Sequence, residues 1–279
     1  MPIILSFTQI ENKLWAAGPE GLFVMNGNGL EAVPQPEVEL ACCGTDGERI
    51  LVGGLPHGTA FSLDAGDTWQ ASWMDGVEAP VLCIAADPQV AESGVLLAGS
   101  AGGGILRSHN RGQSWTVCNF GLQDYTVLTI AWAPISPSDR WPQWEVVFAG
   151  TEEGLYRSPN AGRGWKRSEG IQGVVQTIAV APDFHTTGIV LAGTEEQGLW
   201  RSGDGGRTFQ PIAAAPTRVD ALAPTVDGWL LSDETQLWHS QDGQAWCARA
   251  DSKPALALFP TQDGVWIGGE QGAEFLPTV

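Results

Sequence analysis

The sequence predicts an all-β fold, a β-propeller of seven blades with about four antiparallel strands in each. An eight-residue turn motif repeats along the chain, short apolar runs precede its copies, and the units recur with a period of about 40 residues. The 279 residues include 36 Gly, 18 Pro and 13 Trp but only 14 Lys plus Arg, a mix that suits short strands and tight turns. No stretch shows the helical periodicity, over about 10 to 15 residues, of an alternating α/β protein.

The repeated motif reads Ser-x-Asp/Asn-x-Gly-x-x-aromatic. Four copies span 62–69, 108–115, 158–165 and 202–209, a shortened copy spans 240–246, and an eroded relative spans 25–30. The Asp or Asn side chain can accept hydrogen bonds from N–H groups of its own turn, and the Gly supplies a positive φ. The aromatic residue begins the next strand and buries its ring against a neighbouring sheet. We therefore interpret these aspartates as structural, and neither as catalytic nor as calcium ligands.

Apolar runs that end in small residues precede each turn, as expected for strands buried on both faces. They lie at 14–18, 50–54, 95–99, 146–150, 189–193, 229–233 and 265–269. An innermost strand further upstream is clearest at 81–85, 127–131, 175–179 and 255–259. We name the four strands of a unit A to D, with A innermost.

Units begin near residues 3, 38, 81, 126, 174, 218 and 255, which predicts seven blades within one domain over 1–279. The last unit ends after its third strand, so we expect an incomplete seventh blade. Alternatively, the N-terminal segment is shared between blades, and the ring then has six blades.

Two runs, at 149–165 and 192–209, closely resemble the Asp-box repeats of BNR (sialidase-like) propellers, and the resemblance extends over nearly the whole chain. That superfamily includes sialidases, xyloglucan-degrading enzymes, sortilin-type receptors and the propeller factors that help to assemble photosystem II. Because the shared residues are the turn-formers, the resemblance implies the fold and does not select a function.

The catalytic residues of the enzymatic relatives do not map onto this chain. A sialidase-like site would need three arginines, a tyrosine nucleophile and an Arg-Ile-Pro signature, and the signature is absent. Tyr156 occupies a repeat position that other units fill with Phe or Trp, and Tyr125 has no set of arginines around it. Xyloglucanase-like enzymes place two aspartates between two propellers, and this chain offers one propeller. The sequence predicts no catalytic activity, no metal site and no cofactor.

The formal net charge of −18 disfavours nucleic acid and anionic lipid and favours basic partners. Alternatively, the charge only keeps a Trp-rich protein in solution. The chain has no apolar run of about 18 residues and no basic segment before its short N-terminal apolar run. Five cysteines without a CxxC pair are expected to be reduced and mostly buried. We expect a cytoplasmic protein without membrane insertion.

Acidic residues gather in the predicted B–C loops, which strand alternation places on the same face as the connections between blades. We predict an acidic arc around one mouth of the central channel, open at blades two and three, where 55–57 and 101–104 carry no acid. Alternatively, the repeats merely carry the same solvated glutamates. The candidate partner-binding residues are Glu20, Glu152, Glu153, Glu195, Glu196, Asp233, Glu234 and Glu270.

The longest insertion, residues 134–144 between strands A and B of blade four, contains Trp141 and Trp144 together with three prolines. Such a loop suits a preformed, partly apolar contact surface. Its tryptophans could anchor a partner protein or stack on a sugar. Alternatively, they fold over the sheet edge as a lid.

These observations favour a non-catalytic scaffold, assembly factor or accessory subunit that binds one or more proteins, with acidic loops suited to a basic partner. A carbohydrate-binding or degenerate glycosidase-like propeller is the alternative.

Overall fold

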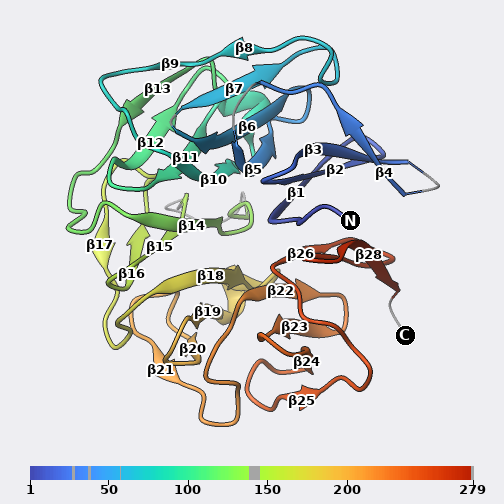
Figure 1. Ribbon diagram of the computed structural model, residues 1–279. Coiled ribbons are helices and arrows are strands. Elements are labelled where there is room, and N and C mark those ends of the chain that lie inside the picture. Colours follow the sequence, from blue (N-terminus) through green and yellow to red (C-terminus); the bar gives the residue numbers. More distant parts are fainter. Residues whose placement is uncertain (27–28, 37–38, 57, 138–144, 278–279) are drawn as a thin grey trace.

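A computed structural model describes residues 1–26, 29–36, 39–56, 58–137 and 145–277, and these residues form seven small sheets arranged as a ring of blades (Figure 1). Seven blades are confirmed, and the six-bladed alternative is wrong. The A strands are β1 (Ser6–Ile10), β5 (Glu39–Thr45), β10 (Val81–Ala86), β14 (Val127–Trp132), β18 (Val175–Val180), β22 (Ala221–Thr225) and β26 (Ala257–Pro260). All seven line a central channel of about 340 Å³.

The B and C strands pair antiparallel with their neighbours in every blade. The B strands are β2 (Lys13–Gly18), β6 (Ile50–Leu55), β11 (Leu96–Ser100), β15 (Val147–Thr151), β19 (Val190–Thr194), β23 (Gly228–Ser232) and β27 (Gly264–Gly269). The C strands are β3 (Gly21–Asn26), β7 (Thr59–Ser62), β12 (Gly104–Ser108), β16 (Leu155–Ser158), β20 (Leu199–Ser202), β24 (Leu237–Ser240) and β28 (Gly272–Pro277). The B strands of blades 3, 4 and 5 are buried at every position, as the apolar runs predicted.

Short D strands complete blades 1 to 6: β4 (Gly29–Val33), β8 (Gln70–Ala71), β13 (Ser114–Val117), β17 (Lys166–Arg167), β21 (Gln210–Pro211) and β25 (Cys247–Ala248). Within the described residues blade 7 has three strands, which confirms the expected incomplete blade. The ring closes between the last and first blades, where Ile4 donates its N–H to the C=O of Gly269 at 3.1 Å.

Each repeated motif forms a turn held by its own side chains. In blade 5 the hydroxyl of Ser202 donates to Asp204 Oδ1 at 2.7 Å and accepts the N–H of Gly206 at 2.9 Å. Asp204 Oδ1 also accepts the N–H of Thr208 at 3.0 Å. The copies at 62–69, 108–115 and 158–165 repeat these three bonds. The Asp and Asn side chains thus hold their own turns, in agreement with the sequence interpretation.

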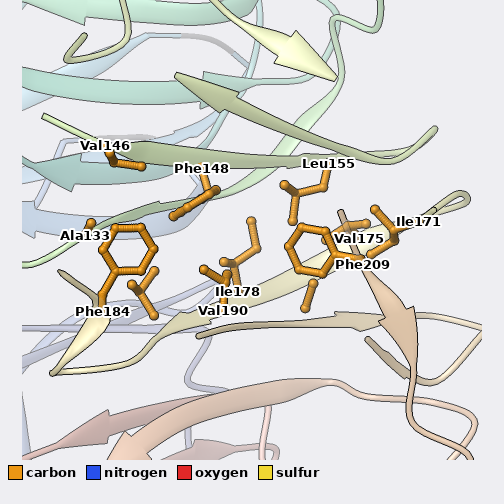
Figure 2. Packing of buried hydrophobic residues seen from close by; sticks show 12 residues of the cluster. Ala133, Val146, Phe148, Leu155, Ile171, Val175, Ile178, Phe184, Val190 and Phe209 are labelled. Carbon is orange, nitrogen blue, oxygen red and sulfur yellow. The ribbon is translucent and has the colours of Figure 1, made fainter. Parts of the chain in front are cut away.

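The aromatic residue that ends each motif packs between its own blade and the preceding one. Figure 2 shows this at the junction of blades 4 and 5, where the fully buried ring of Phe209 lies with Leu155, Ile171 and Val175 in one cluster. Phe148 of strand β15 belongs to the same cluster, so apolar burial at this junction joins the two sheets.

Three elements depart from the predicted repeat. Two four-residue helices, α1 (Val90–Ser93) and α2 (Phe184–Thr187), lie in the A–B connections of blades 3 and 5. Strand β9 (Trp73–Met74) leaves blade 2 and pairs parallel with β13, so the sheet of blade 3 has a fifth strand. Among the described residues no helix is long and apolar enough to cross a membrane.

Candidate partner-binding face

The ring has two distinct faces. We call the face that carries the B–C and blade-to-blade connections the loop face, and the opposite one the Asp-box face. On the loop face, the B–C residue Glu153 donates its N–H to Asp124, which lies between blades 3 and 4, at 2.9 Å. On the Asp-box face, Gly205 of the motif turn donates its N–H to Gly188 of an A–B connection at 3.0 Å. The strand alternation assumed from the sequence is therefore present.

The predicted acidic residues all lie in B–C connections of the loop face, but they differ in exposure. Glu195 is half-buried and Asp233 is buried, with only 8% of its surface exposed. The carboxylate of Glu20 accepts the N–H of Ile3 at 3.1 Å. The exposed members are Glu20, Glu152, Glu153, Glu196, Glu234 and Glu270.

Asp233 holds its own loop. Its Oδ1 accepts the N–H groups of Thr235 and Gln236 at 2.7 and 2.8 Å, and its Oδ2 accepts the Nε1–H of Trp238 at 2.8 Å. Burial alone would raise the pKa of this carboxyl, but these bonds and that from the Thr235 hydroxyl outweigh burial, so the pKa lies below its usual value. Asp233 therefore stabilises the loop, and its neighbour Glu234 is exposed to solvent.

A basic residue between blades 5 and 6 lies among these acids. Arg218 Nε bonds to Asp220 Oδ1 at 2.7 Å, and its Nη1 lies 3.8 Å from Glu195 Oε1. The hydrogen bond to Asp220 is the main cause of a raised pKa for Arg218, to which the charges of Asp220, Glu195 and Glu234 add. Arg218 was not among the residues predicted from the sequence, because it lies in a connection between blades and not in a B–C loop.

A cleft of about 330 Å³ opens on the loop face between blades 6 and 7. We call it the blade 6–7 cleft. It brings together Glu234 and Glu270, which are contributed by different blades. Its charged lining consists of four acids and two bases: Asp220, Glu234, Glu270, Glu274, Arg218 and Lys253. Leu256 and Ile267 are among the residues that line it. The cleft can therefore accept an apolar group and hold a cation beside it.

The other sequence candidates are placed as follows. Tyr156 is fully buried opposite Ala149 of β15, and Trp200 and Trp238 hold the same register position, which confirms a packing role. Tyr125 is 47% exposed. Trp141 and Trp144 lie outside the described residues, so their role stays a prediction.

In the described ranges no group of three or more His, Cys, Asp or Glu side chains could hold a metal ion. All five cysteines are free. The expectation that they are mostly buried holds for Cys42 and Cys43, whereas Cys83 and Cys118 are half-buried and Cys247 is exposed.

No protein-family model matches the chain, and no curated protein matches it in sequence. In structure it is similar to the GH74 xyloglucanase from Xanthomonas campestris, with a TM-score of 0.75 and 16% identity over 98% of this chain and 51% of that one. An ancestral GH74 enzyme has a TM-score of 0.73 and 16% sequence identity, over 96% of this chain and 43% of that one. YCF48 bound to a D1 peptide has a TM-score of 0.74 and 17% sequence identity, over 100% of this chain and 93% of that one.

The chain thus spans about half or less of the GH74 enzymes and nearly all of YCF48. These neighbours are seven-bladed propellers, so the similarity establishes the fold. The relationship to Asp-box families rests on the sequence resemblance alone.

Proposed function

We propose that this protein is a non-catalytic scaffold, assembly factor or accessory subunit that binds a basic segment of a partner protein on its loop face. The observation that carries the proposal is the blade 6–7 cleft, which Glu234 and Glu270 of two different blades line together with the apolar side chains of Leu256 and Ile267. A lysine or arginine of the partner would enter with its charge toward these carboxylates and its methylene groups against Leu256 and Ile267.

Two further facts support this function. A net charge of −18 attracts basic partners at long range and speeds their association at low salt. A propeller of the same shape, YCF48, has been solved bound to a D1 peptide, which is a precedent for a propeller that holds a segment of another protein. We place the interaction in the cytoplasm, a compartment in which the five free thiols stay reduced.

The test is affinity purification of the tagged chain from its host at low salt, followed by elution with rising salt and mass spectrometry. A stoichiometric basic protein that salt releases supports the proposal. Double reversal of Glu234 and Glu270 to Lys should abolish its capture, whereas reversal of Glu11 and Glu92, exposed on the Asp-box face, should not.

A third variant separates the cleft from the wider acidic arc. Reversal of Glu152 and Glu196, which are exposed in blades 4 and 5, should weaken capture only if the arc contributes as a whole. Capture that all three double variants leave unchanged would contradict binding on the loop face. Recovery of the chain without a companion, together with binding to an oligosaccharide, would favour the carbohydrate-binding alternative.

A further inference from the structure

Two arginines of the C strands reach across blade junctions on the Asp-box face. Arg107 of β12 donates its Nε–H to the C=O of Ala161, in the motif turn of the next blade, at 3.1 Å. Arg157 of β16 donates in the same way to the C=O of Gly205 at 2.8 Å. Each of these arginines directly precedes the motif of its own blade, so the same arrangement occurs at the junctions of blades 3 and 4 and of blades 4 and 5.

A second arginine, from the motif turn, lies near each of them. At the junction of blades 3 and 4 it is Arg163, whose Nη1 lies 3.5 Å from Glu145 Oε2. At the junction of blades 4 and 5 it is Arg207. Within the part of the chain that the structure describes, neither Arg157 nor Arg207 forms an ion pair. The first junction therefore carries an ion pair, and the second carries two unpaired guanidinium groups.

The difference between the two junctions comes from one position of the repeat. The C=O of Glu145 accepts the N–H of Ala161 at 2.9 Å, and the C=O of Gly188 accepts the N–H of Gly205 at 3.0 Å. Glu145 and Gly188 thus hold equivalent places beside their motif turns. Because glycine has no side chain, the acid that pairs with an arginine at the first junction has no counterpart at the second.

Asp204 does not replace this acid. Its Oδ1 accepts the hydroxyl of Ser202 at 2.7 Å and the N–H groups of Arg207 and Thr208 at 2.9 and 3.0 Å. Its Oδ2 accepts the hydroxyl of Thr208 at 2.8 Å. Both carboxylate oxygens are thus used within the motif turn, and neither pairs with a guanidinium group.

A cavity of about 340 Å³ lies at this second junction, and we call it the Arg157 cavity. The two arginines line it together with Gly188, and so does Thr186, whose exposed hydroxyl makes no hydrogen bond to any described residue. Val146 and Phe184, which are labelled in Figure 2, also line it. The cavity therefore adjoins the position where the preceding junction carries its acid.

The absence of the acid leaves positive charge uncompensated. Burial of the guanidinium is the main cause of a lowered pKa for Arg157, and the charge of Arg207 lowers it further, whereas only the charge of Asp204 opposes them. The Nη groups of Arg157 have no hydrogen-bond partner among the described residues. An anion near both guanidinium groups would supply acceptors for these donors and favour the charged form of each arginine.

We propose that the Arg157 cavity binds a phosphate group, which pairs with Arg157 and Arg207. A guanidinium group presents its donors in a planar fork that matches the oxygens of phosphate. A phosphate ester carries a charge of about −1.5 to −2 at pH 7, which balances two guanidinium groups, whereas a carboxylate balances only one. The site lies on the Asp-box face and does not depend on the binding of a basic segment to the loop face.

The test is calorimetric titration of the full chain at about pH 7.5 and low salt, with inorganic phosphate and, separately, with glycerol 2-phosphate. We expect one site that saturates below about 5 mM, with acetate at least about tenfold weaker. Because the net charge of −18 disfavours anions in general, background binding should be small. Saturation by both ligands identifies the free anion as sufficient, and saturation by the ester alone assigns the phosphate to a larger molecule.

Three variants locate the site. Arg207→Gln, at an exposed side chain, should weaken phosphate binding about tenfold. Arg157→Lys, which keeps the charge but loses the planar fork, should weaken it as well. Arg163→Gln is the matched control at the junction that has its acid, and it should leave the affinity unchanged.

Three results would overturn the proposal. The first is the absence of saturation by either phosphate ligand below about 10 mM. The second is equal affinity for acetate and phosphate. The third is an equal effect of Arg207→Gln and Arg163→Gln, which would indicate an adventitious ion only.

Discussion

Gly206 and Phe148 meet across the junction of blades 5 and 4 with no room for a side chain between them. A Cβ atom on Gly206 would lie 2.2 Å from Cε1 of Phe148, and the φ of Gly206 is +80°. The equivalent Gly112 would place a Cβ 2.2 Å from Leu51. The glycine of the motif therefore serves two purposes, since it closes the turn and lets the turn approach the preceding blade.

Gly206→Ala should lower the free energy of unfolding by about 3 kcal/mol, because backbone strain at positive φ adds to overpacking against Phe148. Gly47→Ala is the matched control, since Gly47 has a φ of +94° but no atom within 4 Å of its Cβ position. That variant should lose about 1 kcal/mol. Urea unfolding measures both, and equal losses would show that the contact between blades does not restrict residue 206.

Asp204 should make the stability of blade 5 depend on pH. Burial alone raises its pKa, but hydrogen bonds from Thr208, Ser202 and Arg207 outweigh burial and hold the pKa at about 2, below the ordinary 3.8. Because the folded-state pKa is the lower one, the carboxylate stabilises the fold above about pH 3.8, and this contribution is lost as the pH falls toward 2.

Asp204→Asn keeps the Oδ1 acceptor, as Asn110 does in blade 3, and should flatten the fall in stability between pH 3.8 and 2. Asn110→Asp should steepen it. Urea midpoints measured across this range test both variants. Parallel curves for the wild type and the two variants would rule out the turn carboxylates as the source of the pH dependence.

The motif turns and buried B strands could be predicted because their chemistry is local. Ser202, Asp204 and Gly206 act within one turn, so their spacing alone specifies the bonds that they make. The alternation of strands likewise placed the B–C loops on one face. Helix α2 was not predicted, because a single turn of four residues is too short to show a periodic pattern.

The properties of single site residues depend on contacts that the sequence does not reveal. Asp233 and Glu234 are adjacent acids in one loop, yet Asp233 is buried and accepts a hydrogen bond from Trp238, whereas Glu234 is exposed. The pairing of Arg218 with Glu195 joins the B–C loop of blade 5 to the connection between blades 5 and 6, which lie 23 residues apart in the sequence.

Asp233→Ala should destabilise the protein by about 2 kcal/mol, since it leaves two loop N–H groups and the Trp238 indole without their acceptor. Glu234→Ala should change stability by less than about 0.5 kcal/mol, as expected for an exposed side chain. For partner capture at low salt we expect the opposite order, so that Glu234→Ala reduces capture more than Asp233→Ala does. A loss of capture in Asp233→Ala that exceeds its loss of folded protein would instead assign Asp233 to the binding surface.

The five thiols should react in an order set by exposure and by the pKa of each, because the thiolate is the reactive form. Burial raises the pKa of Cys43 and Cys83 to about 12 and that of Cys42 well above its usual value. Cys247 is exposed on the outermost strand of blade 6. Cys118 is half-buried, and burial raises its pKa as well.

Alkylation at about pH 8, followed by mass spectrometry of peptides, should therefore label Cys247 first and Cys118 more slowly. Cys42 and Cys43 are buried and Cys83 is half-buried, but the raised pKa of all three leaves little thiolate at this pH, so we expect them to react only when urea unfolds the chain. Rapid labelling of Cys42 in the native protein would mean that strands β5 and β10 separate readily, since its sulfur lies 3.8 Å from the C=O of Val81 in the next blade. That result would locate a weak junction of the ring between blades 2 and 3.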